Sequence, residues 1–556
     1  MTSINELCLG QPRFPDGGGA ALAAKHGALA AWQLALTQKG PAVAAAGVSG
    51  PFAIGLRESS GRAYLAVDRF AMCTLCYRVV DGQLTFSERA DQLVERGDEL
   101  DRQAIFDYLY FHAIPSPRSI FHGVHRVPPG HYVLFEDGRL TVAPYWVPEF
   151  HEPSGKPCFA SLRDEFRSLL RVAVSDQLDT GKHACFLSGG TDSSTVAGMI
   201  REATGQAAAT YSIGFEADGY DEMAYARVAA RAFGTEHHEY YVTPEDLVKS
   251  IPTVAGFYDQ PFGNSSALPA YYCARMARDD GVTRILAGDG GDELFGGNSR
   301  YAKQRVFGWY GMLPAPLRRG LMGPFFERPS VARMPVLKKG SSYIEQAKMP
   351  MPDRLQMYNL LLRLGIENVL SRDFLAQVDV QAPAAQQRAV WKSPIAQSDI
   401  NRTLAFDWRY TLGESDLPKV RGTTQLAGIA VGYPMLDERL LEFSMRLPTD
   451  YKLKNLKLRW FFKEALRGFL PDEILTKKKQ GFGLPFGVWL TRHGALKKLA
   501  IDSLASLSTR GIVRPEFITE LVDKRLAEHP AYYGEMVWIM MMLEQWLQQH
   551  SPGFRS

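Results

Sequence analysis

A short glycine-rich string in the middle of the chain places the strongest limit on its fold. Apolar residues up to Leu187 run into Ser188-Gly189-Gly190, and Thr191-Asp192-Ser193-Ser194 lead into a segment with helical spacing. Glycines let the backbone approach an anion closely, and free amide groups at a helix N-terminus attract it. This order predicts a phosphate-binding loop rather than a plain turn with a serine N-cap. The string lacks the Gly-Lys-Ser or Gly-Lys-Thr ending of a Walker loop.

The segments around this string alternate between strand and helix patterns, which predicts a parallel α/β sheet. From about residue 308 onward, amphipathic helical segments dominate, and an apolar Trp- and Met-rich segment near the end is interpreted as core packing. We expect helices at 162–178, 193–204, 222–233 and 537–548, and strands at 183–187, 208–213 and 283–286.

The N-terminal part has a different pattern, with short β-like runs separated by turns. Asp81-Gly82 and Asp137-Gly138 are hairpin signals. A connection rich in Pro, Gly, Ser and charge follows at 148–156. The sequence therefore predicts a β-rich domain at 1–150 and an α/β domain at 157–550. We expect strands at 52–56, 63–67, 77–80, 83–87 and 131–135.

Composition excludes several classes of protein. The 556 residues are 46% hydrophobic and carry a net charge of only +3, so no global field favours nucleic acid or an anionic membrane. No window approaches the ~18 to 20 apolar residues that span a bilayer. Six irregularly spaced cysteines fit a reducing compartment. We expect a cytoplasmic protein, with Cys73 and Cys76 packed rather than metal-bound and His237-His238 at the end of a strand.

A second loop is glycine-rich and acidic. Gly288-Asp289-Gly290-Gly291-Asp292 follows the apolar run at 283–286. Loops at the carboxyl ends of parallel strands meet in one crevice. Asp192 and Asp292 are therefore expected to hold Mg²⁺ between them while it bridges nucleotide phosphates. A solvated acidic turn is the alternative interpretation of this loop alone.

At this point the chain resembles the asparagine synthetase family. Its pyrophosphate loop Ser-Gly-Gly-x-Asp-Ser-Ser matches 188–194. Further matches in family order are Tyr220-Asp221-Glu222, Gly234 to His238, Asp259 to Phe262, the acidic loop, Tyr433 to Asp437 and Lys479 to Pro485. Weaker matches at 50–54, 66–69, 120–124 and 128–131 resemble the family's glutamine-hydrolysing domain. The resemblance implies an N-terminal Ntn-hydrolase-like domain and a C-terminal adenine-nucleotide α-hydrolase-like domain with a helical end.

The resemblance also implies an activity, an ATP- and Mg²⁺-dependent ligase. A substrate carboxylate would attack the α-phosphate, pyrophosphate would leave, and ammonia or an amine would attack the acyl-adenylate. By family position Lys479 would stabilise the developing charge, whereas Lys477 and Lys478 would be solvated, and Asp289 and Asp416 would serve the acyl transfer. The implied nucleotide-binding residues are Leu187, Ser188, Gly189, Gly190, Asp192, Ser193, Ser194, Ile213 and Gly288.

The chain departs from the family where glutamine is used. Residue 2 is Thr2 instead of the nucleophilic cysteine, the first cysteine is Cys8, and the segments that build the glutamine pocket are missing before Gly50. We therefore expect no glutamine hydrolysis. A second departure is Ile429-Ala430-Val431-Gly432 in place of Leu-Glu-x-Arg, which puts aspartate as the substrate in doubt unless the loop is held another way.

Several functions stay open at this level. Within the same chemistry, β-lactam synthetase and the lasso-peptide macrocyclase also lack the N-terminal cysteine and use an amine of the substrate itself. The carboxylate partner is then a small molecule or a peptide. A homodimer is possible. From another class, the chain would be a non-catalytic nucleotide-binding scaffold.

Overall fold

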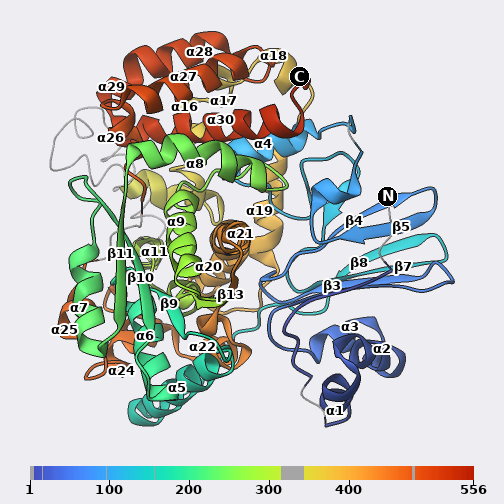
Figure 1. Ribbon diagram of the computed structural model, residues 1–556, viewed down its shortest axis with the longest axis vertical. Coiled ribbons are helices and arrows are strands. Elements are labelled where there is room, and N and C mark those ends of the chain that lie inside the picture. Colours follow the sequence, from blue (N-terminus) through green and yellow to red (C-terminus); the bar gives the residue numbers. More distant parts are fainter. Residues whose placement is uncertain are drawn as a thin grey trace.

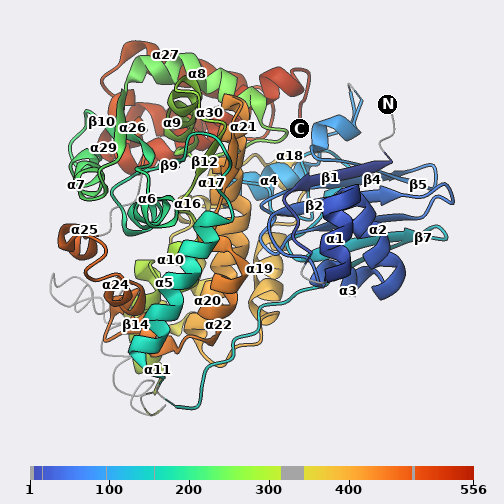
Figure 2. The same ribbon diagram turned by 60° about the horizontal axis from the view of Figure 1, so that its bottom comes forward.

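The computed structural model describes residues 5–14, 17–95, 97–155, 157–312, 314, 343–478 and 483–556. The chain forms an N-terminal part of two antiparallel sheets and a larger C-terminal part around a parallel sheet (Figure 1). Turned by 60°, the N-terminal sheets and the first three helices lie to one side of the C-terminal part (Figure 2). No helix in the described part of the chain is long and apolar enough to cross a membrane.

The N-terminal part is layered. The first sheet has the order β1-β2-β3-β7-β8 and the second has the order β5-β4-β6. Helices α1 (Gly17–His26), α2 (Ala28–Lys39) and α3 (Pro41–Ala46) cover the outer face of the first sheet. The strands are β1 (Glu6–Gly10), β2 (Phe52–Arg57), β3 (Ala63–Val67), β4 (Cys76–Val80), β5 (Gln83–Ser87), β6 (Val124–Arg126), β7 (His131–Glu136) and β8 (Arg139–Pro144).

The side chains of strand β2 explain why the first sheet packs between the helices and the second sheet. Phe52 and Ile54 pack against the helices, with Trp32 of α2 among their neighbours. The alternate positions are small, because a Cβ at Gly55 would lie 2.4 Å from the ring of Phe86 in the second sheet. Successive side chains of a strand point to opposite faces. Strand β2 therefore presents large side chains to the helices and small side chains to the other sheet.

The expected strands of this part are confirmed, and so are the hairpins. Asp81-Gly82 joins β4 to β5 and Asp137-Gly138 joins β7 to β8, with φ of +50° and +72° and of +51° and +72°. Two consecutive positive φ values are those of the type I′ turn that suits strand twist. The helices at 17–46 were not expected, because their alanine-rich sequence has weak amphipathic periodicity.

The sheet of the C-terminal part has the order β11-β10-β9-β12-β13, and every pair is parallel. The strands are β9 (Ala184–Phe186), β10 (Ala209–Phe215), β11 (Glu236–Val242), β12 (Arg284–Leu286) and β13 (Ala430–Gly432). Ala184 and Ile285 face one layer of helices, while Cys185 and Leu286 face the other. From the central strand β9, the next strands in the chain, β10 and β11, lie on one side of the sheet, and β12 and β13 lie on the other side. A crevice at the carboxyl ends of β9 and β12 is thus the expected ligand site of an open α/β sheet.

Helices cover both faces of this sheet. The layer with α5 (Phe159–Ser175), α6 (Thr191–Thr204) and α7 (Met223–Phe233) lies opposite the layer with α9 (Ala267–Asp279) and α21 (Leu417–Ala427). The expected helices at 162–178, 193–204 and 222–233 and the strands that alternate with them are confirmed with shifted ends. Two strands differ from expectation: His237 and His238 lie inside β11 rather than at a strand end, and β13 was missed because it is three residues long.

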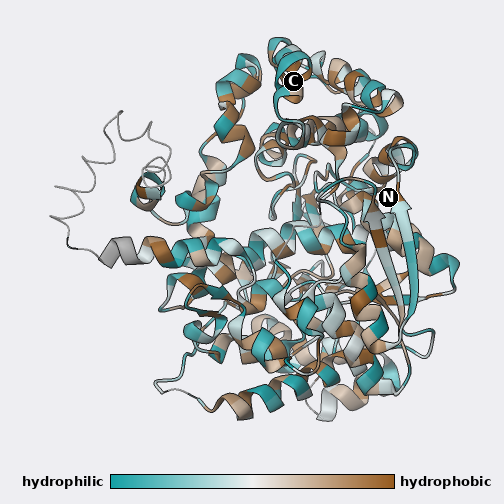
Figure 3. Ribbon diagram, turned by 90° about the vertical axis from the view of Figure 1, so that its left-hand side faces the viewer, coloured by the Kyte–Doolittle hydropathy of each residue, from teal (hydrophilic) through white to brown (hydrophobic). Residues whose placement is uncertain are grey.

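The helical end of the chain packs around one long helix. All residues of α30 (Pro530–His550) from Met536 to Leu547 are buried, which confirms the expected apolar core helix. It lies between α8 (Pro244–Phe257), α26 (Phe486–Leu490) and α27 (Gly494–Ser508). Polar and apolar residues alternate along many of the outer helices of this view (Figure 3).

A second helical stretch borders the crevice. It consists of α20 (Asp399–Asp407), a π-helical segment at Trp408–Asp416 and α21. A π-helical turn places one extra residue in the helix and is often found at functional sites. Here the π-helical segment ends at Asp416, three residues before Lys419.

Ion pairs join the two parts. Arg13 of the N-terminal part donates to Asp437 at 2.8 Å and to Glu438 at 3.2 Å, and the backbone N–H of Gly50 donates to Glu438 at 2.7 Å. Asp437 also begins α22 (Glu438–Arg446) as its N-cap. The family-like motif at 433–437 therefore serves the docking of the two parts.

Candidate active site

The glycine-rich string forms the turn between β9 and α6. Gly189 has φ +68°, and a Cβ there would lie 2.4 Å from the backbone nitrogen of Ala226 in α7. Only glycine fits both conditions. The hydroxyl of Ser193 accepts a hydrogen bond from the backbone N–H of Ser188 at 3.1 Å. Thus the loop is held closed by its own serines, as a rim at the N-terminus of a 14-residue helix.

The acidic loop lies directly beside this rim. A Cβ on Gly288 would come within 2.8 Å of the backbone nitrogen of Ser193. A Cβ on Gly291 would meet the Asp192 carboxylate at 2.3 Å, and one on Gly297 would meet the Asp292 carboxylate at 1.7 Å. Glycine is therefore needed at these positions of the loop, because any larger side chain would collide with the phosphate-type loop or with the two aspartates. The two strings that the sequence singled out meet at the ends of β9 and β12.

Arg459 joins the two acidic side chains, and the sequence analysis did not single it out. One of its guanidinium nitrogens, Nη1, lies 2.9 Å from Asp192 Oδ2, 2.7 Å from Asp292 Oδ1 and 2.9 Å from Thr191 Oγ1. The other, Nη2, donates to Asp192 as well. Arg459 is 4% exposed. Burial alone would lower its pKa, but the two aspartates outweigh this and raise the pKa above its ordinary value.

Lys419 of α21 forms a second charged group with two predicted residues. Its ammonium group lies 3.0 Å from Asp416 Oδ1 and 3.5 Å from Asp289 Oδ1. Burial raises the pKa of Asp289 even though Lys419 opposes the change. Burial would lower the pKa of Lys419, but Asp416 and Asp289 raise it. Lys419 is thus held as a cation between two carboxylates.

The lysine run after α25 (Asp472–Thr476) gives a mixed result. Lys479 lies outside the described residues. Lys478 is exposed, as expected. Lys477 was expected to be solvated, and this was wrong: its side chain is 8% exposed, 2.8 Å from the Glu222 carboxylate and 4.5 Å above the ring of Tyr225. Its ammonium group also donates to the carbonyl of Gly189 at 3.5 Å.

These groups surround one cavity of about 620 Å³, which lies within the range of small-molecule sites. Its lining includes Leu187, Ser188, Gly190, Asp192, Ser193, Ile213, Gly288, Asp289, Asp292 and Asp416. Of the predicted residues that the structure describes, Gly189 and Ser194 are not in the lining. The hydroxyl of Ser194 is buried, and no described residue is its hydrogen-bond partner. The lining also includes a mostly apolar group from β10 and α9, namely Tyr211, Pro269, Ala270 and Cys273.

The Ile429–Gly432 segment has a structural explanation. It enters β13, which pairs with β12 in parallel register, with Gly432 opposite Leu286. A Cβ at Gly432 would lie 2.7 Å from both Gln177 Oε1 and Leu286 Cδ2. Strand pairing therefore holds this segment, none of whose residues lines the cavity, and the segment fits no large side chain at position 432.

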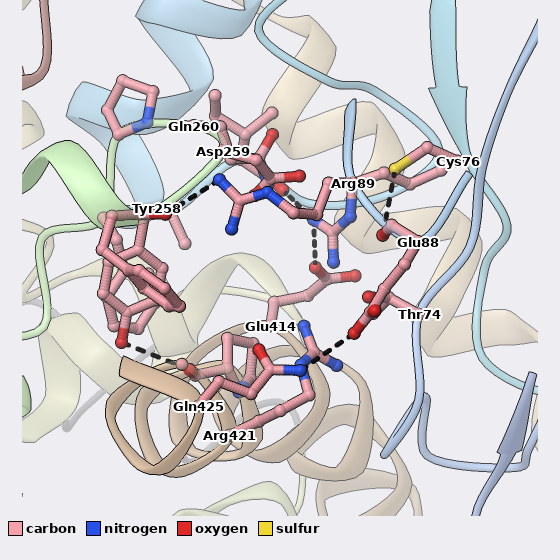
Figure 4. A pocket seen from close by; sticks show the side chains of 18 residues that line it. Thr74, Cys76, Glu88, Arg89, Tyr258, Asp259, Gln260, Glu414, Arg421 and Gln425 are labelled. Carbon is pink, nitrogen blue, oxygen red and sulfur yellow. Dashed lines mark hydrogen bonds and ion pairs between the residues drawn. The ribbon is translucent and has the colours of Figure 1, made fainter. Parts of the chain in front are cut away.

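A separate cavity of about 50 Å³ lies where the two parts of the chain meet (Figure 4). Its polar groups already have partners: Arg126 pairs with Glu414 at 3.1 Å, and the Gln425 amide donates a hydrogen bond to Glu88 at 2.9 Å. Arg421 donates to the carbonyl of Met72 at 3.2 Å. This cavity is small and its polar groups join the two parts, so it belongs to the interface rather than to the candidate site.

The cysteines and histidines singled out earlier lie away from the cavity of the candidate site, except Cys273. All six cysteines are unpaired. Cys8 lies in β1 opposite Ile54, and burial raises its pKa. Among the described residues, Glu236, His238 and Asp280 lie close enough to share a metal, but Lys182 already contacts both carboxylates at 3.0 Å and 2.6 Å.

Comparisons with known proteins agree with this geometry. Residues 165–548 match the family model described as asparagine synthase, and residues 33–146 match the glutamine amidotransferase domain. The chain is 25% identical over 492 residues to glutamine-hydrolyzing asparagine synthetase 1 of Bacillus subtilis, covering 87% of this chain and 74% of the relative. It is 26% identical over 463 residues to a putative glutamine-hydrolyzing asparagine synthetase of Mycobacterium tuberculosis, covering 82% and 68%. A putative synthetase of Methanocaldococcus jannaschii is 33% identical over 249 residues, covering 43% and 48%.

Proposed function

This chain belongs to the asparagine synthase family, and on that premise we propose that it is an ATP-dependent ligase that forms an amide bond. A carboxylate oxygen of the substrate attacks the α-phosphorus of ATP, and the bond to pyrophosphate breaks. The nitrogen of ammonia or an amine then attacks the acyl carbon and AMP leaves. One observation carries the proposal: the phosphate-type loop and the acidic loop converge at the carboxyl ends of β9 and β12.

The donor set fits Mg²⁺. Three oxygens, from Thr191, Asp192 and Asp292, point to within 2.7–2.9 Å of a single nitrogen of Arg459, and carboxylate oxygens are ligands that Mg²⁺ prefers. Asp192 and Asp292 would hold the ion, which when bound neutralises charge on the phosphates. The residues of the chain bind and orient the triphosphate: the Ser188 and Ser193 hydroxyls, the N-terminus of α6 and the Lys477 cation lie along the same rim.

The second step requires loss of a proton from the attacking amine. Asp289 supports this role, because its carboxylate lines the cavity and burial raises its pKa, which makes it a better proton acceptor than an ordinary aspartate. Lys419 holds the Asp289 and Asp416 carboxylates at a fixed place. By family position, Lys479 stabilises charge at the acyl centre.

We propose that the nitrogen does not come from glutamine. Cys8 lies in the paired strand β1, and its raised pKa disfavours the nucleophilic thiolate. The N-terminal domain, placed at 1–150, then has a structural role, which is supported by its ion pairs to Asp437 and Glu438. The catalytic domain is placed at 157–550. We place the reaction in the cytoplasm, since the six cysteines are unpaired. For the assembly we propose a homodimer.

We propose aspartate as the first candidate for the substrate carboxylate, because the segment that replaces Leu-Glu-x-Arg is held in another way, by pairing of β13 with β12. A peptide carboxylate with an internal amine, as in macrolactam or β-lactam formation, is the second candidate, because the Leu-Glu-x-Arg sequence itself is lost.

Exchange of labelled pyrophosphate into ATP tests the proposal, because it reports adenylation without the amine. The purified protein is assayed with Mg²⁺, ATP and a panel of carboxylates that includes aspartate and a leader-bearing peptide. We expect exchange that depends on one carboxylate class. Nucleotide binding without exchange for any carboxylate of the panel would favour a non-catalytic nucleotide-binding scaffold instead.

A further inference from the structure

Arg459 occupies the place between Asp192 and Asp292 where a divalent ion is expected. Its Nη1 nitrogen touches three oxygens, one from each aspartate and one from Thr191, at 2.7–2.9 Å. A single positive group surrounded by oxygens from two loops resembles a metal site in its arrangement. Arg459 therefore offsets one of the two negative charges of this carboxylate pair within the protein.

The position of this guanidinium is enforced by its surroundings. The residue is 4% exposed and its Cζ lies 3.9 Å from the centroid of the Phe462 ring. Gly291 and Gly297 leave space for the Arg459 side chain, because a Cβ at either position would come within 3.0 Å of it. The residue itself has φ +52° and precedes α24 (Trp460–Ala465). Arg459 is thus part of the packed wall rather than a surface side chain that happens to reach the aspartates.

One donor of the same group is unsatisfied. The Nε–H of Arg459 is buried and has no hydrogen-bond partner among the residues that the structure describes. Arginine presents its donors as a planar fork that matches the oxygens of a phosphate. A phosphate in this cavity can therefore offer the guanidinium partners that the two aspartates do not.

We propose that Arg459 is a resident counter-cation of the Asp192–Asp292 pair, which keeps a divalent ion out until a triphosphate supplies both the ion and a new anionic partner for the guanidinium. A bare ion must displace a buried arginine and leave it unpaired, which is costly. A metal–triphosphate complex replaces both carboxylate contacts with phosphate contacts. Arg459 is a positioning residue in this scheme, and the scheme rests on the nucleotide site proposed above.

Two consequences distinguish this role from simple charge neutralisation. Binding of the ion and binding of the triphosphate must be coupled, and the coupling is reciprocal. The coupling must also depend on the contacts of Arg459 rather than on the positive charge of the cavity. Lys463 of α24 offers the comparison, since it lines the same cavity and no hydrogen bond joins it to either carboxylate among the described residues.

The experiment titrates Mn²⁺ into the full-length protein and measures bound ion by electron paramagnetic resonance, with and without a non-hydrolysable ATP analogue. In the wild type, Mn²⁺ alone should bind weakly, and the analogue should tighten it about tenfold or more. Arg459→Gln should bind Mn²⁺ alone about tenfold more tightly than the wild type and should gain little from the analogue. Adding Asp292→Asn to Arg459→Gln should abolish that gain.

Lys463→Gln removes the same charge from the same cavity and should raise the affinity for Mn²⁺ much less. Equal effects of the two variants, or an unchanged affinity in Arg459→Gln, would overturn the proposal. If Arg459→Gln does not fold, Arg459→Lys keeps the charge without the fork and should still bind Mn²⁺ alone more tightly than the wild type; no increase would overturn it. Because the free analogue also binds Mn²⁺, its own binding is measured without protein and subtracted. Failure of the nucleotide site itself would show separately, as an analogue that never changes the remaining Mn²⁺ binding in the wild type.

Discussion

The ammonium group of Lys419 lies 3.0 Å from the carboxylate of Asp416, three residues earlier in the chain. The π-helical segment that ends at Asp416 passes into α21 at this point, so one turn of helix presents both groups to the cavity. Asp289, from the loop after β12, completes the group at 3.5 Å from Lys419. Asp416, which is close to Lys419 in the sequence, and Asp289, which is 130 positions away, thus both contact the Lys419 ammonium group.

This group predicts a selective effect of Asp289→Asn. The amide keeps the shape but cannot accept a proton, so product formation should fall by ~10² to 10⁴. Adenylation should continue, because Asp289 acts only in the second step. Pyrophosphate exchange and product formation are measured side by side. If exchange falls together with product, Asp289 acts in adenylation and not as the acceptor of the amine proton.

Asp192→Asn and Asp292→Asn are expected to lose adenylation. Either change removes one of the two carboxylates that Arg459 bridges and that we assign to the ion. Pyrophosphate exchange should fall by at least ~10², while affinity for ATP changes less. Asp164→Asn, on the exposed face of α5, is the matched control. Exchange at the wild-type rate in both variants would remove the basis for the ion site.

Lys477 and Lys478 should behave differently although they are adjacent. Lys477→Met leaves the carboxylate of Glu222, whose side chain is 12% exposed, without its partner, which should lower the stability of the protein and impair exchange. Lys478→Met should do neither, since Lys478 is exposed. Thermal unfolding and exchange are measured for both. In the Lys477→Met background, Glu222→Gln should recover part of the stability; a further loss of stability would argue against the pair.

Glutamine should not serve as the nitrogen donor. Cys8 is held in β1, its raised pKa disfavours the thiolate, and Thr2 lies outside the described residues. The purified protein should release no glutamate from glutamine, whereas ammonia or an amine should support product formation. Release of glutamate that is lost in Cys8→Ala or Thr2→Ala would contradict this.

Lys452 should make stability depend on pH. It is fully buried, its ammonium group donates to Asn401 at 2.8 Å, and burial lowers its pKa from 10.5 to about 7. Between about pH 7 and 10.5 the unfolded chain binds this proton and the folded chain does not. Stability from this residue therefore rises with pH across that window. Lys452→Met should flatten the rise in Tm, measured from pH 7 to 10 against the wild type. The same slope in both proteins would exclude Lys452 as its source.

The sequence alone determined the elements with strong local signals. The type I′ turns at Asp81-Gly82 and Asp137-Gly138, the turn at Gly189 and the alternation of strands and helices around it all follow from backbone preferences and periodicity. These depend on neighbours within a few residues. The family motifs likewise indicated Asp192, Asp289, Asp292 and Asp416 without any structure, and all four line one cavity.

Only the tertiary structure decided which cations meet these carboxylates. Arg459 is 267 positions from Asp192, and nothing in its local sequence distinguishes it from a surface arginine. Lys477 and Lys478 look alike in the sequence, yet one is buried against Glu222 and the other is exposed. Strand β13 was missed for a similar reason, since its three residues are held by pairing with β12. Charge pairing and short-strand pairing depend on atoms brought together by the whole fold, so a pattern confined to neighbouring residues carries no record of them.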